Sequence, residues 1–338
     1  MKKQRKGVLL LNLGTPSSSN TKDVRRYLRE FLMDPRVIDI SALGRWILVN
    51  GFVAPFRSPK SAKEYQKVWT KEGSPLLVHG LQLKSDLQEK MGDEYVVELG
   101  MRYQEPSVKS ALATFKNKGF ESLTIIPLYP QYASATTGST IEAVNKELNT
   151  WQIIPSLRVI SNFISQPLYS SAFAEIGNKY WQTKEYEHIV FSYHGLPERQ
   201  IEKASCDNYC QMNEKCCDTY HSKNQYCYRA QCFETTRLIV EKMNLSPDQY
   251  TICFQSRLGR SEWIKPYISN VVPKLAQKGI KKVLVFSPSF VADCLETTIE
   301  IGEEYKELFL KNGGEKWQLV ESLNTHPTWV ECLVELSR

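Results

Sequence analysis

The sequence predicts an α/β protein with two similar domains, each built on a four-stranded, mainly parallel sheet flanked by helices. Three observations predict this fold. Short apolar runs end at glycine or proline, helical stretches separate these runs, and the order of the features repeats in the two halves of the chain. A length of 338 residues is enough for two domains with separate cores.

In the first half, strand-like runs alternate with helical stretches. The predicted strands are Gly7–Leu13, Tyr95–Met101, Leu123–Leu128 and Arg158–Ile160. The predicted helices are Thr21–Met33, Ser107–Lys118 and Thr140–Leu148. We expect one domain at residues 1–165 and the other at 166–338, the latter ending in a helix at Thr328–Leu336.

The second half repeats four features of the first half in the same order. They are a Gly-x-Pro turn after a strand, a Tyr and an Arg that bracket a strand, a Pro followed by two Thr, and a final short strand. The first copy is Gly14-x-Pro16, Tyr95 with Arg102, Pro127 with Thr136-Thr137, and Leu157–Asn162. The second copy is Gly195-x-Pro197, Tyr250 with Arg257, Pro288 with Thr297-Thr298, and Gln318–Asn324. The repeat predicts equivalent strand ends that face one another across an interdomain cleft.

Composition and motifs exclude several classes of function. The net charge of +6, from 43 basic and 37 acidic residues, is too small and dispersed to indicate nucleic-acid binding. Neither half carries a glycine-rich phosphate-binding motif, so we expect no nucleotide. The apolar run Val8–Leu11 is too short for a signal peptide, and no run reaches the roughly 18 residues of a spanning helix. We therefore expect a cytoplasmic protein with reduced cysteines.

The segment 45–60 is strongly apolar but contains Gly51 and Pro55. The commoner outcome for such a segment is a helix and loop buried in the core. The other interpretation is an apolar lip over a site, whose residues 45–56 contact a membrane surface and make the protein membrane-associated.

His194 has the best placement for chemistry among the five histidines, because it follows the apolar strand Ile189–Tyr193 and precedes a Gly-x-Pro turn. Glu296 and Glu300 open a predicted helix that extends to Leu310 and would share one of its faces. A converging His and Glu form a proton-transfer pair or a ligand set for a divalent metal ion. The alternatives are a core histidine bonded to a carbonyl and a solvated acidic turn.

A cysteine-rich insertion at 203–232 holds six of the nine cysteines: Cys206, Cys210, Cys216, Cys217, Cys227 and Cys232. This density predicts metal ligation, and a disulfide scaffold is the weaker interpretation without an export signal. Four thiolates can hold zinc or an iron–sulfur cluster, and spacing alone does not choose between them.

Several motifs together resemble the ferrochelatase family. Phe191–Pro197 resembles its signature. The other matching segments, in the family's order along almost the whole chain, are Leu11–Pro16, Arg57–Lys60, Tyr129–Tyr132, Thr136–Ser139, Phe254–Arg257 and Asp293–Thr297. Ferrochelatases insert Fe(2+) into a porphyrin in the last step of haem synthesis and have two Rossmann-like, chelatase-type domains.

The resemblance implies roles for particular residues. His194 accepts pyrrole protons, Glu296 relays protons or holds the incoming iron together with His194, and Glu300 extends an acidic path. The implied ring contacts are Leu13, Tyr129 and Trp263, and the implied partners of the propionates are Arg57, Lys60 and Ser256. Arg102 is expected to be structural. Cys294 stands where some members carry a histidine, so we assign it no catalytic role.

The insertion resembles that of bacterial ferrochelatases with an internal [2Fe-2S] cluster. This resemblance implies Cys210, Cys216, Cys217 and Cys227 as ligands, with Cys206 and Cys232 as alternates. The role of the cluster stays open.

The form of Asp293–Thr297 resembles enzymes that use protoporphyrin IX. The alternatives are a coproporphyrin ferrochelatase, a cobalt or nickel chelatase, and a tetrapyrrole carrier without turnover. The oligomeric state is open, because no dimerisation signature stands out.

Overall fold

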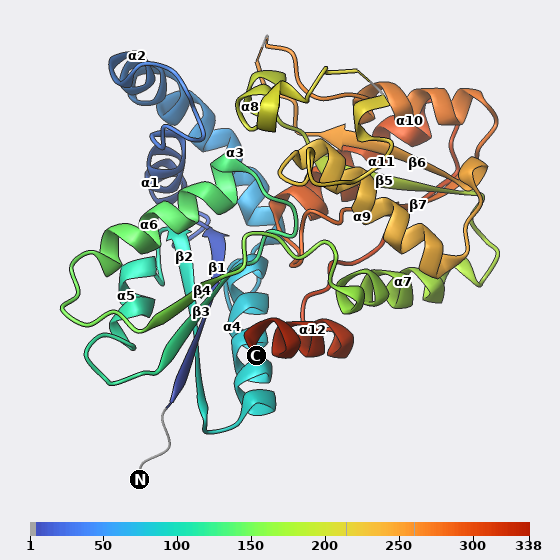
Figure 1. The fold of residues 1–338 in the computed structure, drawn as a ribbon. Helices are drawn as coiled ribbons and strands as arrows, with labels where there is room; N and C mark the ends of the chain where they lie inside the picture. Colours follow the sequence, from blue (N-terminus) through green and yellow to red (C-terminus); the bar gives the residue numbers. More distant parts are fainter. Residues whose placement is uncertain (1–4, 214, 260) are drawn as a thin grey trace. The chain divides into compact units, whose positions relative to one another are not determined.

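The computed structural model describes residues 5–213, 215–259 and 261–338, and the chain divides into two compact units (Figure 1). Unit 1 comprises the chain up to Tyr129 together with Ala133–Asn162 and Val330–Arg338. Unit 2 comprises Pro130–Tyr132 and Phe163–Trp329. Each unit therefore has an internal sheet of its own.

The described residues form two four-stranded sheets in which neighbouring strands pair in parallel. The strands are β1 (Lys6–Gly14), β2 (Tyr95–Tyr103), β3 (Ser122–Pro127), β4 (Ser156–Val159), β5 (His188–His194), β6 (Tyr250–Gln255), β7 (Lys282–Phe286) and β8 (Lys316–Leu319). The order is β2-β1-β3-β4 in unit 1 and β6-β5-β7-β8 in unit 2. The predicted fold is confirmed, and strands that the sequence repeat matched occupy equivalent places in the two sheets.

Helices connect these strands. The α-helices are α1 (Thr21–Leu32), α2 (Ala42–Ile47), α3 (Ala54–Val68), α4 (Pro75–Met91), α5 (Val108–Ala113), α6 (Ser139–Leu148), α7 (Pro167–Trp181), α8 (Glu198–Lys203), α9 (Tyr228–Met243), α10 (Ile268–Gln277), α11 (Tyr305–Lys311) and α12 (Pro327–Ser337). The π-helical segments are η1 (Leu48–Val53), η2 (Ser134–Gly138) and η6 (Glu296–Glu304), and short 3-10 turns are η3 (Cys206–Asn208), η4 (Lys215–Cys217) and η5 (Pro247–Gln249). Local signals start several helices: the Asn20 side chain accepts from the Asp23 amide at α1, and proline opens α4 and α7.

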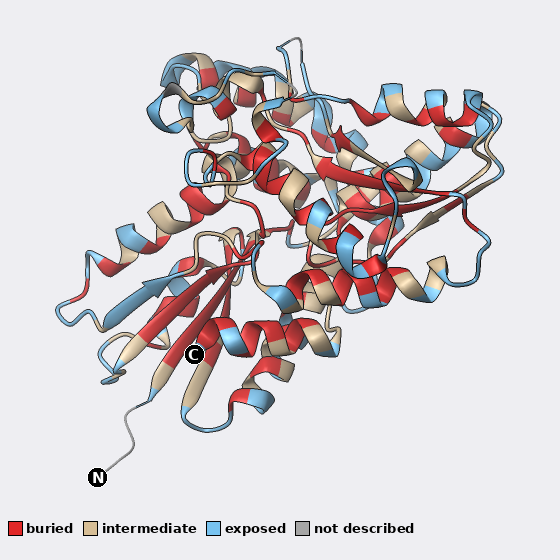
Figure 2. Ribbon diagram, turned by 45° about the vertical axis from the view of Figure 1, so that its right-hand side comes forward, coloured by how far each residue is buried: buried red, intermediate tan, exposed pale blue. Residues whose placement is uncertain are grey.

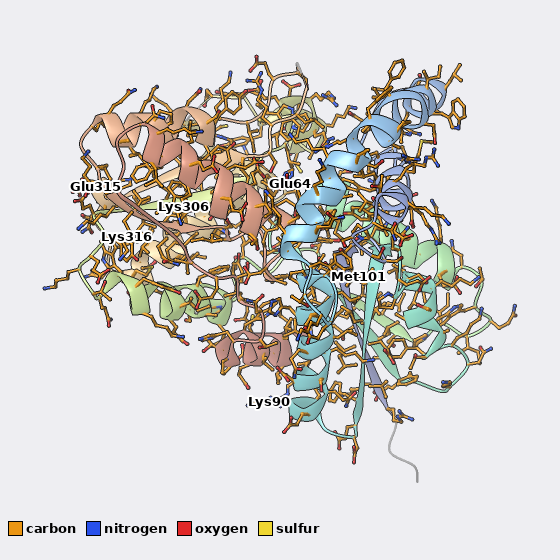
Figure 3. All side chains as sticks on the ribbon, turned by 180° about the vertical axis from the view of Figure 1, so that it is seen from behind. Glu64, Lys90, Met101, Lys306, Glu315 and Lys316 are labelled. Atoms are coloured by element: carbon orange, nitrogen blue, oxygen red, sulfur yellow. The ribbon has the colours of Figure 1, made fainter. Side chains whose placement is uncertain are left out.

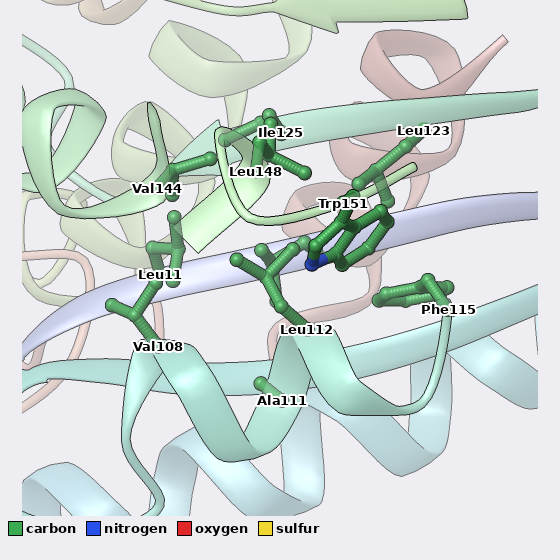
Figure 4. Packing of buried hydrophobic residues seen from close by; sticks show 11 residues of the cluster. Leu11, Val108, Ala111, Leu112, Phe115, Leu123, Ile125, Val144, Leu148 and Trp151 are labelled. Atoms are coloured by element: carbon green, nitrogen blue, oxygen red, sulfur yellow. The ribbon is translucent and has the colours of Figure 1, made fainter. Parts of the chain in front are cut away.

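One hydrophobic core cluster of unit 1 lies between one face of its sheet and helices α5 and α6. Leu11 and Leu123 of the sheet pack with Leu112 of α5, Leu148 of α6 and the Trp151 ring (Figure 4). Both sheets are mostly buried in Figure 2, as expected for parallel strands with covered faces. This packing explains why the strands read as continuous apolar runs in the sequence.

The two outermost strands, β4 and β8, differ in burial. Leu157 pairs with Leu123 and Trp317 pairs with Val283, so the two side chains occupy equivalent places. Leu157 is 42% exposed, whereas Trp317 is 6% exposed and its indole donates to the Ile301 carbonyl at 2.9 Å. The core of unit 2 thus extends to its edge strand, where Lys316 is labelled in Figure 3, while the core of unit 1 stops one strand earlier.

The helix that follows the last strand of each unit belongs wholly or partly to the other unit. Helix α7 follows β4 but is part of unit 2, and Val330–Arg338 of α12 follow β8 but are part of unit 1. There Glu331 lies 3.9 Å from the ammonium group of Lys90 on α4 (Figure 3). The boundary expected from the sequence kept all of α12 in the second domain. Sequence order could not place this segment, because its packing partner lies far earlier in the chain.

The segment 45–60 is helical throughout, because α2, η1 and α3 follow one another without a break. Pro55 directly follows the first residue of α3 after the π-helical segment η1, and Pro59 lies inside α3, so neither proline breaks the helical path. The exposed large apolar side chains of this segment, which define the apolar lip, are Trp46, Ile47, Leu48, Phe52 and Phe56, at 38–77% exposure. The expectation of a buried helix and loop is therefore wrong. Within the described residues, no helix is both long and apolar enough to cross a membrane.

Candidate active site

His194 ends β5, next to Gln255 at the end of β6. The imidazole Nδ1 lies 2.6 Å from the Gly195 carbonyl oxygen. A carbonyl can only accept, so Nδ1 carries the proton and Nε2 keeps its lone pair. The side chain is half-buried and therefore presents a proton acceptor at the carboxyl end of the sheet.

Aromatic rings surround this imidazole. The ring centroids of Trp263 and Phe290 lie 6.3 Å and 6.4 Å from that of His194. Gly195 makes this approach possible, since a Cβ there would lie 2.8 Å from the Gln255 carbonyl oxygen and 3.1 Å from the Trp263 ring. The glycine of the Gly-x-Pro turn thus has a steric role.

Glu300 is fixed by hydrogen bonds from the end of β6. Its carboxylate accepts from the Ser256 amide at 2.8 Å, the Ser256 hydroxyl at 2.5 Å and the Gln255 side chain at 3.1 Å. Burial raises the pKa of Glu300 above its ordinary value, although Ser256, a charged His194 and Gln255 all act to lower it. Glu300 and His194 therefore form an electrostatically linked pair in unit 2.

Glu296 and Glu300 both lie on η6, a π-helix, and not on the α-helix that the sequence predicted. Hydrogen bonds in a π-helix join residues five apart, so residues four or five apart lie near one face. The neighbouring Cys294 is buried, and burial followed by the charge of Glu296 raises its pKa far above that of a free thiol. This thiol stays protonated, in line with its lack of an assigned catalytic role.

The predicted ring and propionate contacts are split between the units. Leu13 is the second-last residue of β1 in unit 1. Tyr129 follows β3, where its hydroxyl lies 3.5 Å from that of Thr140 and burial raises its pKa. Arg57 and Lys60 are exposed on α3 of unit 1. Ser256 and Trp263 belong to unit 2 with His194, Glu296 and Glu300.

A buried polar network closes the same end of the sheet in unit 1. The Asp34 carboxylate accepts from the Arg102 guanidinium at 2.7 Å, the Tyr103 hydroxyl at 2.9 Å and the Ser139 hydroxyl at 2.5 Å. Burial alone would raise the pKa of Asp34, but these donors, the Arg36 amide and the Arg102 charge lower it. Arg102 thus binds Asp34 within unit 1, as expected for a structural residue.

Sequence reasoning missed several residues of these networks. Ser139 stands two residues after Thr137, as Glu300 stands two after Thr298, so the same offset would have identified it as the counterpart of Glu300. Ala135 is likewise the counterpart of Glu296. Phe290 follows the matched Pro288 closely, but no pattern in the sequence indicated that its ring would lie near His194.

Four of the predicted cysteine ligands lie close to one another. The sulfur atoms of Cys216 and Cys217 are 3.8 Å apart. Hydrogen bonding between the thiols of Cys217 and Cys227 raises the pKa of Cys217 and lowers that of Cys227. Burial, with Cys216 and Cys217 nearby, raises the pKa of Cys210.

The two alternate cysteine ligands, Cys206 and Cys232, differ in burial. Cys206 is exposed, at the rim of a small cavity that Cys210, Cys216 and Cys227 also line. Cys232 is fully buried within α9. No group of three or more His, Cys, Asp or Glu side chains in the described part of the chain has the arrangement of a metal site.

Comparisons with known proteins agree with this architecture. A family model described as Ferrochelatase matches residues 5–338. Ferrochelatase from Legionella pneumophila (strain Philadelphia 1) is 49% identical over 329 residues, covering 97% of both chains. Ferrochelatase from Coxiella burnetii (strain CbuG_Q212) is 44% identical over 332 residues, covering 98% of this chain and 93% of that one.

Among solved structures, SirB from Bacillus subtilis with Fe3+ matches with a TM-score of 0.50 and 11% identity, covering 99% of this chain and 96% of that one. This likeness supports the fold alone. The family model and the two relatives span almost the whole chain. The chain therefore belongs to the ferrochelatase family, the lyases that insert iron into a porphyrin during haem synthesis.

Proposed function

We propose that this chain inserts Fe(2+) into protoporphyrin IX, with His194 as the acceptor of the pyrrole protons. The observation that carries the proposal is the tautomer of His194, whose Nε2 is free to accept because Nδ1 donates to the Gly195 carbonyl. Insertion removes two N–H protons from the macrocycle, and a neutral imidazole is a suitable base near pH 7.

Glu300 supports the removal of these protons. Its burial raises the pKa, so it takes up a proton more readily than an ordinary carboxylate, and a charged His194 lowers that pKa again. A proton that leaves His194 for Glu300 relieves the charge on the imidazole and restores the base for the second proton. Glu296, the first residue of the same π-helix, holds the incoming iron or relays protons.

Contacts with the porphyrin divide into ring and propionate contacts. We assign ring contacts to Leu13, Tyr129 and Trp263 because they are apolar or aromatic and lie at strand ends or, for Trp263, beside His194. The indole N–H of Trp263 is buried and has no hydrogen-bond partner among the described residues, so it can donate to a substrate.

The propionate partners are the exposed cations Arg57 and Lys60 of α3. The Ser256 hydroxyl was expected to join them, but it donates to Glu300. We therefore assign Ser256 to the support of Glu300.

We also propose a [2Fe-2S] cluster in the cysteine-rich insertion, held by Cys210, Cys216, Cys217 and Cys227. Two thiolates on one tetrahedral metal ion with bonds of about 2.3 Å lie about 3.8 Å apart, which is the separation of the Cys216 and Cys217 sulfurs. Cys210, Cys216, Cys217 and Cys227 interact pairwise, and they would hold the cluster if the insertion brought their sulfur atoms together. When bound, the cluster supplies a centre that can change its oxidation state.

Metal analysis tests this assignment. Protein purified without oxygen should be reddish-brown and contain two irons and two sulfides per chain. Replacing Cys217 by serine should remove the colour, while replacing the exposed Cys206 should leave it. A colourless protein with one zinc per chain would refute the iron–sulfur assignment.

The apolar lip suits contact with a membrane surface, because an exposed apolar helix face gains free energy by entering the lipid interface. We expect Trp46→Ser with Phe56→Ser to weaken sedimentation with phospholipid vesicles. Leu157→Ser, at an exposed apolar position elsewhere on unit 1, serves as the matched control. Equal sedimentation of the lip variant and the native chain would contradict the proposal.

The substrate is tested by steady-state iron insertion under anaerobic conditions. Protoporphyrin IX should give a higher kcat/KM than coproporphyrin, and the reverse order would assign the chain to coproporphyrin. His194→Ala should lower turnover by about 10²–10⁴-fold, while His188→Gln, at the other end of β5, should not. Porphyrin binding without turnover in the native chain would identify a carrier.

A further inference from the structure

Tyr228 joins the cysteine-rich insertion to the main chain of His194. It is the first residue of α9 and directly follows Cys227, which caps that helix. Its side chain is only 7% exposed. Its hydroxyl lies 2.8 Å from the His194 carbonyl oxygen and 3.2 Å from the Ser289 hydroxyl.

The three groups form a closed ring of hydrogen bonds. The His194 amide donates to the Ser289 hydroxyl at 3.3 Å. The Tyr228 hydroxyl donates to the His194 carbonyl, because a carbonyl only accepts. The Ser289 hydroxyl then donates to Tyr228, so each hydroxyl donates once and accepts once. Every buried polar atom of the ring is satisfied, and the main chain of His194 is held at both its amide and its carbonyl.

This ring of hydrogen bonds influences the orientation of the His194 imidazole. The Nδ1 of His194 is bonded to the carbonyl of the next residue, Gly195, so the orientation of the imidazole follows the local main chain. A shift of the His194 carbonyl would move Nε2, the proton acceptor. Positioning within fractions of an ångström matters for proton transfer, because the transfer needs a short donor–acceptor distance.

Through its main chain, Tyr228 is linked to the sulfur atoms of the insertion, because it directly follows Cys227. The Cys227 thiol interacts electrostatically with that of Cys217. The Cys227 amide donates to the Asn224 carbonyl at 2.9 Å, and its carbonyl accepts from the Gln231 amide at 3.0 Å in the first turn of α9. A change in the Cys217–Cys227 pair therefore acts on the first turn of α9, which carries Tyr228.

We propose that Tyr228 is a positioning residue that couples the state of the Cys217–Cys227 pair to the placement of His194. The inference rests on the proposed roles of His194 and of the insertion, and it assigns the insertion a control of proton transfer. A rearrangement of the Cys217 and Cys227 sulfur atoms, as on loss of a bound metal, would displace Tyr228 and weaken its bond to the His194 carbonyl.

The first test compares Tyr228→Phe with Tyr220→Phe. Tyr220 is a matched control, since its hydroxyl also donates to a main-chain carbonyl, that of Gln225 at 3.2 Å, within the insertion. Tyr228→Phe removes both hydrogen bonds of this hydroxyl, and the loss of the one to the His194 carbonyl should lower kcat about tenfold. It should leave the KM for porphyrin and the metal content unchanged, and Tyr220→Phe should leave kcat unchanged too. An unchanged kcat in Tyr228→Phe would overturn the proposal.

The second test is a double-mutant cycle with Cys217→Ser, read by the NMR amide and carbonyl shifts of His194 as well as by kcat. If Tyr228 transmits the change, Cys217→Ser shifts the His194 signals in the native background but not in Tyr228→Phe, and the two losses of kcat are not additive. Additive losses, or equal shifts in both backgrounds, would overturn the coupling.

The same cycle separates this proposal from the proposed function. If His194→Ala kept full turnover, the role of His194 as base would fail. The His194 shifts would still report whether Tyr228 transmits a change from Cys217, because they do not depend on turnover or on which metal the insertion holds.

Discussion

The two units have equivalent sheets but different chemistry at the carboxyl ends of their strands. Leu13 precedes the Gly-x-Pro turn in unit 1, where unit 2 has His194. Ala135 and Ser139 stand in unit 1 where Glu296 and Glu300 stand in unit 2. The same backbone framework thus carries an apolar strand end in one unit and an acid–base group in the other.

The two units also differ in the groups that surround a buried carboxylate. Asp34 in unit 1 is paired with Arg102, and its donors hold its pKa below the ordinary value. Among the described residues, Glu300 in unit 2 receives its hydrogen bonds from neutral groups of Gln255 and Ser256, and burial raises its pKa. A paired carboxylate stabilises a fold, whereas an unpaired one is available for proton transfer.

The largest expected effect on stability follows from the pairing in unit 1. Asp34→Asn leaves the Arg102 charge without its buried partner, since the Asp34 side chain is only 4% exposed. The free energy of unfolding should fall by about 3–5 kcal/mol, measured by urea denaturation. Glu142→Gln, which removes the exposed ion pairs with Arg36 and Lys146, should cost less than about 1 kcal/mol. Equal losses of unfolding free energy in the two variants would show that the Asp34 network stabilises unit 1 no more than exposed ion pairs do.

The edge strands give a second contrast. Trp317→Ala should lower the free energy of unfolding by about 3–5 kcal/mol, because it empties a filled core position in unit 2. Leu157→Ala, at the equivalent place in unit 1, should cost about 0.5 kcal/mol or less, because its side chain is exposed. A large loss from Leu157→Ala would mean that β4 is covered in solution.

The smallest expected effect is the pH dependence due to Glu300. Its pKa is raised by burial, so between the ordinary carboxyl pKa and the raised value the folded state binds more protons than the unfolded state. Stability contributed by this group is therefore lost as the pH rises through that interval. Glu300→Gln should remove this decline from the curve of unfolding free energy against pH. An unchanged curve would show that Glu300 does not titrate with a raised pKa in the folded protein.

Much of the fold was predictable from the sequence. The matched pairs at Gly14 and Gly195 and at Pro127 and Pro288 mark equivalent strand ends, because glycine and proline stop strands by local geometry. The place of His194 at a strand end followed from the same local pattern. Local rules also apply to the helices that the sequence predicted at Thr21, Ser107, Thr140 and Thr328, whose starts lie within one residue of those observed.

The remaining features depend on contacts between distant residues. The bonds of Tyr228 and Ser289 to His194 join segments 34 and 95 residues apart, and no periodicity encodes them. The assignment of Val330–Arg338 to unit 1 depends on packing near α4. The apolar lip was misjudged because Gly51 and Pro55 indicate a break, yet both fit a continuous helical path.

We propose that the strand end at Leu13 in unit 1 supplies porphyrin binding, whereas the equivalent strand end at His194 in unit 2 supplies proton transfer. The most direct measurement compares kcat and the KM for porphyrin in Leu13→Ala and His194→Ala. Leu13→Ala should raise KM about tenfold with kcat retained, as expected for a lost apolar contact of roughly 1–3 kcal/mol. His194→Ala should lower kcat by about 10²–10⁴-fold with KM retained. A loss of kcat in Leu13→Ala as large as that in His194→Ala would contradict the division of roles between the two units.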